Sequence, residues 1–159
     1  MDLKLLCIGI FCLFLVSSCK PVEEELSPLE KFKEIQTQIE QTWMDYHTAY
    51  EKEDIDSVMS FFTERCIIMP DYGITIKGKK ELEESFSEFF TKNNVAVTNR
   101  VSTEFMVHRD DIFEIGEIEQ LIITDKEDTV AARSRYIIGF QKQEDDSWKI
   151  HRWLNQPEW

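Results

Sequence analysis

Residues 95–154 read VAVTNRVSTEFMVHRDDIFEIGEIEQLIITDKEDTVAARSRYIIGFQKQEDDSWKIHRWL, and the architecture follows from this stretch. β-branched and aromatic residues dominate it, and polar clusters at 109–111, 125–128 and 144–147 interrupt it. The first kind of residue favours extended chain, and the clusters favour turns. We therefore expect four consecutive strands, 95–107, 112–123, 129–141 and 148–154, which short turns join into an antiparallel meander.

Upstream of these strands, apolar residues recur at helical spacing. Residues 29, 32, 35, 39, 43, 46 and 50 are apolar at intervals of three or four, which predicts one long amphipathic helix. Ser27 followed by Pro28 marks its start. Shorter helices are expected over 54–62 and 79–91, with short strands over 66–69 and 74–76 between them. The order α-α-β-β-α-β-β-β-β predicts an α+β domain with its helices on one face of the sheet.

The composition excludes several classes of function. The chain has 159 residues, of which 42% are hydrophobic, so one folded domain is expected. Lysine and arginine total 18 against 31 aspartate and glutamate, a net charge of −13. Because so acidic a surface repels phosphate backbones, nucleic acid is not an expected partner. We expect no cofactor, since nucleotide-binding and metalloenzyme motifs are missing, and no metal site, since the three histidines are dispersed.

The N-terminus has the character of an export signal. Lys4 precedes an unbroken apolar run over 5–16, which as a helix spans roughly 18 Å at about 1.5 Å per residue. The hydrocarbon core of a bilayer is about 30 Å thick, so a cleaved signal is favoured over a membrane-spanning helix. The run ends in Val16-Ser17-Ser18-Cys19, which resembles the lipobox of bacterial lipoproteins.

That resemblance implies a signal peptide over 1–18, removed before Cys19, and acyl chains such as palmitate on Cys19. The alternative is an ordinary cleaved signal with an incidental cysteine. Residues 19–27 then form an acidic tether, which also resembles the surface-export signal of some bacterial lipoproteins; a plain solvated linker is the alternative. The expected location is the bacterial cell envelope, lipid-anchored, in the outer membrane or at the cell surface. Cys66 is then the lone cysteine of the mature domain, and its apolar neighbours predict a buried, inert thiol.

The expected domain, residues 28–159, resembles the nuclear transport factor 2-like superfamily over about residues 31–155, in particular its SnoaL-like branch. Four motifs carry the resemblance: AYEKEDID at 49–56, CIIMP at 66–70, IKGKK at 76–80, and YIIGF at 136–140 followed by WKIHR at 148–152. The resemblance implies a cone: a strongly curved antiparallel sheet with the long helix laid across it and an apolar pocket inside. It also implies a homodimer formed through the sheet. Members include isomerases, cyclases, dehydratases, hydrolases and non-catalytic modules, so the fold does not fix the function.

A cone enzyme needs an ionisable group inside its pocket. His151 in the last strand is the best histidine candidate; His47 is expected on the solvated side of the long helix, and His108 at a surface turn. Glu117 is the second candidate base. Cross-strand pairs of Glu114, Glu117 and Glu119 with Arg133 and Arg135 are the simpler interpretation, with Glu117 and Glu119 in a solvated or subunit-facing ladder. The alternative places one such pair inside the cone, where it fixes a polar ligand. The candidate pocket residues, for which core packing is the alternative, are Trp43, Tyr46, Met69, Tyr72, Arg135 and Trp153.

The leading hypothesis is a membrane-anchored lipoprotein whose cone binds a small, largely apolar ligand or a protein partner without catalysis. An isomerase, cyclase or hydrolase of small molecules that uses His151 or Glu117 is the runner-up. A dimeric structural or assembly module is the third reading.

The lipid anchor is testable by removing its sulfur. We expect Cys19→Ala to move the protein out of the membrane fraction, because the acyl chains supply the membrane affinity at about 0.8 kcal/mol per buried CH₂. Cell fractionation with immunoblotting measures this, and Cys12→Ala, inside the apolar run, is the matched control. Retention of Cys19→Ala in the membrane fraction would contradict lipidation.

Overall fold

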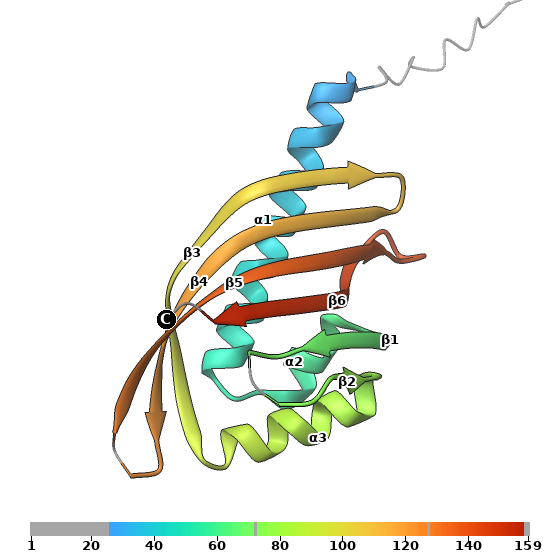
Figure 1. Ribbon diagram of the computed structural model, residues 1–159. Helices are drawn as coiled ribbons and strands as arrows, with labels where there is room; N and C mark the ends of the chain where they lie inside the picture. The colour runs from blue at the N-terminus through green and yellow to red at the C-terminus, as the bar shows by residue number, and fades with distance from the viewer. Residues whose placement is uncertain (1–25, 72, 127, 158–159) are drawn as a thin grey trace, which may run out of the picture.

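A computed structural model describes residues 26–71, 73–126 and 128–157 (Figure 1). The signal peptide, Cys19, most of the tether and Tyr72 lie outside the described residues. Along the chain the elements are α1 (Pro28–Glu51), α2 (Ile55–Ser60), β1 (Phe62–Met69), β2 (Ile76–Lys77), α3 (Lys79–Phe90), β3 (Asn93–His108), β4 (Asp111–Thr124), β5 (Thr129–Lys142) and β6 (Trp148–Pro157). This is the predicted element order. None of the helices within the described part combines the length and apolar character that a membrane span requires.

The strands form one six-stranded sheet in the order β2-β1-β6-β5-β4-β3. β3 to β6 are the predicted antiparallel meander, but β1 pairs with β6 in parallel, with Ile68 opposite Trp153. The antiparallel prediction therefore fails at this one pair. β1 and β6 lie far apart in the sequence, so no hairpin turn fixes their relative direction.

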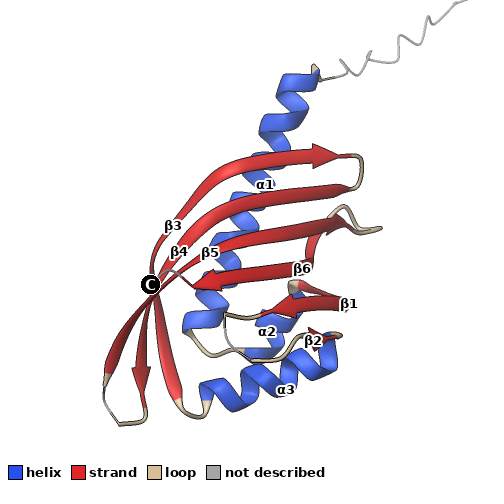
Figure 2. Cartoon of the chain, viewed as in Figure 1, coloured by secondary structure: helices blue, strands red, loops and turns tan. Residues whose placement is uncertain are grey.

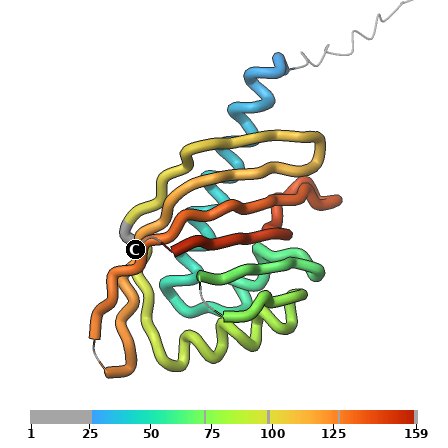
Figure 3. The backbone as a smooth tube through the Cα atoms, in the orientation of Figure 1, coloured from blue at the N-terminus to red at the C-terminus, as the bar shows by residue number. Residues whose placement is uncertain are grey.

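The sheet is strongly curved, as predicted. β3 carries an extra residue at two points, between Val97 and Asn99 and between Ser102 and Glu104. β6 carries one opposite the Gly139–Phe140 step, where His151 has no partner in the register. Such bulges bend a strand and increase its twist. The bend brings the start of β3, the end of β4 and the start of β5 toward α3 (Figure 3).

The helices cover the concave face of this sheet (Figure 2). α1 runs across its inner face, while α2 and α3 pack near β1. At its start, the Ser27 hydroxyl accepts from the Glu30 N–H, and the Glu30 carboxylate accepts from the Ser27 N–H, so the predicted cap is confirmed. Cys66 is fully buried and free, as predicted, and burial raises the pKa of its thiol.

Successive residues of β4 separate two environments. Ile112, Glu114 and Ile118 face the core, whereas Phe113 faces outward, because side chains alternate along a strand. Gly116 sits between them on the inner face. A Cβ there would come within 2.4 Å of both the Tyr136 hydroxyl and the Val101 carbonyl oxygen. Only glycine lets β4 approach these groups so closely.

Candidate functional site

A cavity of about 360 Å³ opens where the C-terminal half of α1, α3, β1 and the curled ends of the long strands meet. Its volume is within the range of small-molecule sites. The walls are mainly apolar and aromatic. The aromatic lining residues are Tyr46, Tyr50, Phe62, Phe86, Phe89 and Trp153, and the polar ones include His47, Asp71 and Ser85.

Two residues of the lining each carry a buried polar atom without a hydrogen-bond partner: His47 at Nε2 and Asp71 at Oδ1. The other carboxylate oxygen of Asp71 accepts a hydrogen bond from the Ser134 hydroxyl at 2.5 Å, which holds the carboxylate in place. Buried polar atoms without partners are costly, at about 1–3 kcal/mol each. Unsatisfied atoms on residues that line a cavity are therefore candidates to bond a ligand that reaches them.

His47 is uncharged in this setting. Burial, and secondarily the positive charge of Arg100, lowers the pKa of its imidazole from 6.5 to about 4. Its ring packs against those of Trp43 and Tyr46, with centroids 5.2 and 5.8 Å away. The prediction that His47 lies on the solvated side of α1 was wrong, because α3 and the curled strands enclose that side of the helix near its end.

A buried ionic network lies beneath this region, and Glu114 is its centre. Glu114 is 0% exposed. Its carboxylate accepts hydrogen bonds from Trp43 Nε1 at 2.8 Å, from the Tyr136 hydroxyl at 2.8 Å and from Arg100 Nη1 at 2.5 Å. All three partners are donors, and they match a side chain whose oxygens accept. We expected Glu114 to pair with an arginine of the neighbouring strand over 129–141. Instead it binds Arg100 of β3, and it faces the core because it shares its parity with Ile112 and Ile118.

Arg100 connects this carboxylate to the helix. Its second terminal nitrogen donates to Glu40 of α1, and its guanidinium lies over the Trp43 ring, 4.8 Å from the centroid. Removing one partner of a buried ion pair typically costs about 3–5 kcal/mol, because a charge is left unpaired. The network therefore fixes the position of α1 relative to β3 and β4.

The residues proposed from the sequence are divided between the two faces of the sheet. Tyr46 and Trp153 line the cavity, and Trp43 packs against both in the core. Met69 and Arg135 are exposed on the outward face. There Met69 pairs with Leu154, and Arg135 with Glu117.

The two candidate bases also lie on the outward face. Glu117 accepts a hydrogen bond from Arg133 at 2.6 Å, and Glu119 forms an ion pair with the same guanidinium, so this part of the ladder is as expected. His151 lies over Gly139, beside Phe113 and 3.9 Å from an Asp111 oxygen. Burial lowers the pKa of the His151 imidazole. Neither residue lines the cavity.

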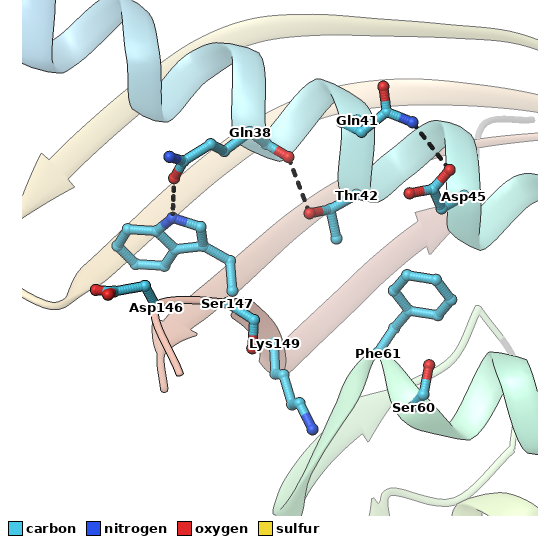
Figure 4. Close-up of a pocket in the computed structure, with 10 residues that line it drawn as sticks. Gln38, Gln41, Thr42, Asp45, Ser60, Phe61, Asp146, Ser147 and Lys149 are labelled. Atoms are coloured by element: carbon cyan, nitrogen blue, oxygen red, sulfur yellow. Dashed lines mark hydrogen bonds between the residues drawn. The ribbon is translucent and has the colours of Figure 1, made fainter. Parts of the chain in front are cut away.

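A second hollow, of about 290 Å³, lies on the other side of α1 (Figure 4). Several of its polar side chains have partners: Gln38 accepts from Trp148 Nε1 at 2.9 Å, and Gln41 donates to Asp45 at 2.9 Å. The described residues that line this second hollow carry fewer buried polar atoms without a hydrogen-bond partner than those of the first cavity do. Among the described residues, no group of three or more possible metal ligands is found.

The comparisons with known proteins concern the fold. No protein-family model and no curated protein matches the sequence. Solved structures do: a ketosteroid isomerase-like protein from Erwinia carotovora atroseptica has a TM-score of 0.68 at 20% identity, over 76% of this chain and 94% of that one. A candidate dehydratase from the NTF2-like family of Streptomyces avermitilis has a TM-score of 0.66 at 12% identity, over 81% and 99%. The fold is therefore the NTF2-like cone.

The state of His47 can be tested by pH. The pKa of the His47 imidazole is lower in the folded protein than in the unfolded chain. The stability that comes from keeping this imidazole neutral is therefore fully present above about pH 6.5 and is lost as the pH falls toward 4. We expect wild type to lose more unfolding free energy between pH 7 and 4 than His47→Gln, which does not titrate. Urea denaturation across this range measures it, with an NMR titration of the imidazole as a second readout. Identical pH profiles for the two proteins would contradict the burial of His47.

Proposed function

We propose that this chain is a SnoaL-like binding protein whose cone takes up a small, largely apolar ligand without catalysis. The observation that carries the proposal is the cavity of about 360 Å³, whose aromatic walls hold the unpartnered atoms of His47 and Asp71. Apolar walls supply affinity, and a few fixed polar groups orient the ligand.

The proposal includes a lipid anchor and a location in the bacterial cell envelope. The apolar run over 5–16 and the small residues before Cys19 support both. α1 begins nine positions after Cys19, so a short tether would hold the cone near the bilayer surface. A ligand that partitions into membranes would then be concentrated close to the cavity.

Proton-transfer catalysis is the second candidate function. His47 and Asp71 favour it, since both present a polar atom in an apolar cavity, as a general base must. The imidazole pKa of about 4 argues against it, because such a base is weak at neutral pH, and the best catalytic pKa lies near the working pH. Binding is therefore the better-supported function.

We also propose that the outward face of the sheet forms a homodimer. The register aligns four apolar residues across β4, β5, β6 and β1: Ile115, Ile137, Leu154 and Met69. The last three are 37–43% exposed, and Phe113 extends the row. A contiguous apolar patch of this kind is typical of interfaces. We expect sedimentation velocity to show a dimer that Ile137→Glu dissociates; a monomeric wild type at high concentration would contradict this.

Ligand uptake is tested by closing the cavity. Ser85 of α3 lines the cavity but is itself exposed, so it lies at the opening. We expect Ser85→Trp to weaken binding of the neutral fluorophore N-phenyl-1-naphthylamine to residues 26–159 by about ten-fold or more, since the indole fills the opening.

The matched control is Ser87→Trp. Ser87 lies on the opposite side of α3, beside Lys80 and Glu84, outside the cavity. Fluorescence titration gives the dissociation constants. The same affinity for both variants and wild type, or no uptake by any of them, would contradict binding in this cavity.

A further inference from the structure

We propose that the ligand is an organic ammonium: an apolar body that carries a protonated amine, which donates to Asp71. This inference rests on the proposed function, because it concerns the same cavity. It goes further in assigning a charge and a functional group to the ligand.

The charges around the cavity point to a cation. The described residues that line it include the Asp71 carboxylate but no lysine or arginine. As a carboxylate, Asp71 offers only acceptors, and Oδ1 remains without a donor. A carboxylate or phosphate ligand would lose its hydration and meet a like charge here. At long range, the net charge of −13 also attracts cations and repels anions.

The aromatic walls provide a second attraction for a cation. Six rings line the cavity, and several meet one another: Tyr46 and Trp153 have centroids 5.7 Å apart, and Trp153 stacks on Phe62 at 6.4 Å. The face of an aromatic ring carries partial negative charge, so it attracts ammonium groups, at about 0.5–2 kcal/mol per contact depending on solvation. The same faces accommodate the apolar body.

His47 complements this arrangement. Its depressed pKa keeps the imidazole neutral, so it does not repel a bound cation. In the tautomer with its proton on Nδ1, the unpartnered Nε2 accepts a second ammonium N–H. A primary or secondary ammonium has at least two N–H donors, enough for one bond to each of these buried atoms.

An alcohol is the competing ligand chemistry, because a hydroxyl also donates to a carboxylate. The distinction is one of charge: a hydroxyl donates a hydrogen bond that is charge-assisted on the carboxylate side only, whereas an ammonium also pairs its positive charge with the carboxylate. An alcohol also gains little from the aromatic faces. The cavity should therefore rank an ammonium above an alcohol of equal size, and both above an anion.

The test compares three probes with one phenyl body: 2-phenylethylamine, 2-phenylethanol and 3-phenylpropionate. Isothermal titration calorimetry on residues 26–159 at pH 7 gives their affinities. We expect the amine to bind about ten-fold tighter than the alcohol or better, and the carboxylate not to bind. Asp71→Asn should weaken the amine by about ten-fold and leave the alcohol within about three-fold. Asp45→Asn, an exposed carboxylate paired with Gln41, is the control and should change neither.

The outcomes separate the two proposals. Equal affinity for amine and alcohol, preference for the carboxylate, or an amine affinity unchanged in Asp71→Asn would overturn the ammonium assignment while leaving cavity binding intact. Failure of all three probes, together with failure of N-phenyl-1-naphthylamine, would overturn both. The ranking on wild type decides the question even if Asp71→Asn folds poorly.

Discussion

The ion pair between Arg100 and Glu114 is the constraint on which the rest of the structure depends. One guanidinium holds a fully buried carboxylate of the sheet and, on its other side, Glu40 of α1. Trp43 of the same helix donates to that carboxylate as well. Burying so much charge is unfavourable unless every group is paired, so α1 has essentially one position in which all bonds form.

The position of α1 in turn creates the cavity. Glu40 and Trp43 are fixed over the middle of the sheet. Tyr46, His47 and Tyr50 lie in the next two turns of α1, beyond the residues that contact the network. There the long strands curl away and α3 closes the opposite side, so these side chains surround a space that they do not fill. The hollow is thus a consequence of a helix held straight across a curved sheet.

The sequence was sufficient for the element order and for much of the core. The spacing of apolar residues in α1 correctly identified Ile39, Trp43, Tyr46 and Tyr50 as buried. Sequence periodicity did not reveal the network of Arg100 and Glu114, because β3 contains a bulge. Val95 and Val97 face inward, and strict alternation would place Arg100 outward; the extra residue before Asn99 turns Arg100 to the inner face, opposite Ile118.

A similar limit applies to the cavity. Glu114 could have been noticed as the one charge among Ile112, Gly116 and Ile118, since these share its parity. The exposure of His47 depends on α3 and on strands far away in sequence, which periodicity within α1 cannot reveal. Asp71 follows β1 in a loop, where no repeating pattern indicates which way a side chain points.

A double-mutant cycle on Arg100→Met and Glu114→Gln tests the central claim most directly. Urea denaturation of wild type, both single variants and the double variant gives the coupling free energy between the two side chains. If the ion pair fixes α1 over the sheet, the coupling should be about 2 kcal/mol or more, and each single variant should be clearly destabilised. Additive effects within about 0.5 kcal/mol would show that the two residues do not act together, and would contradict the account.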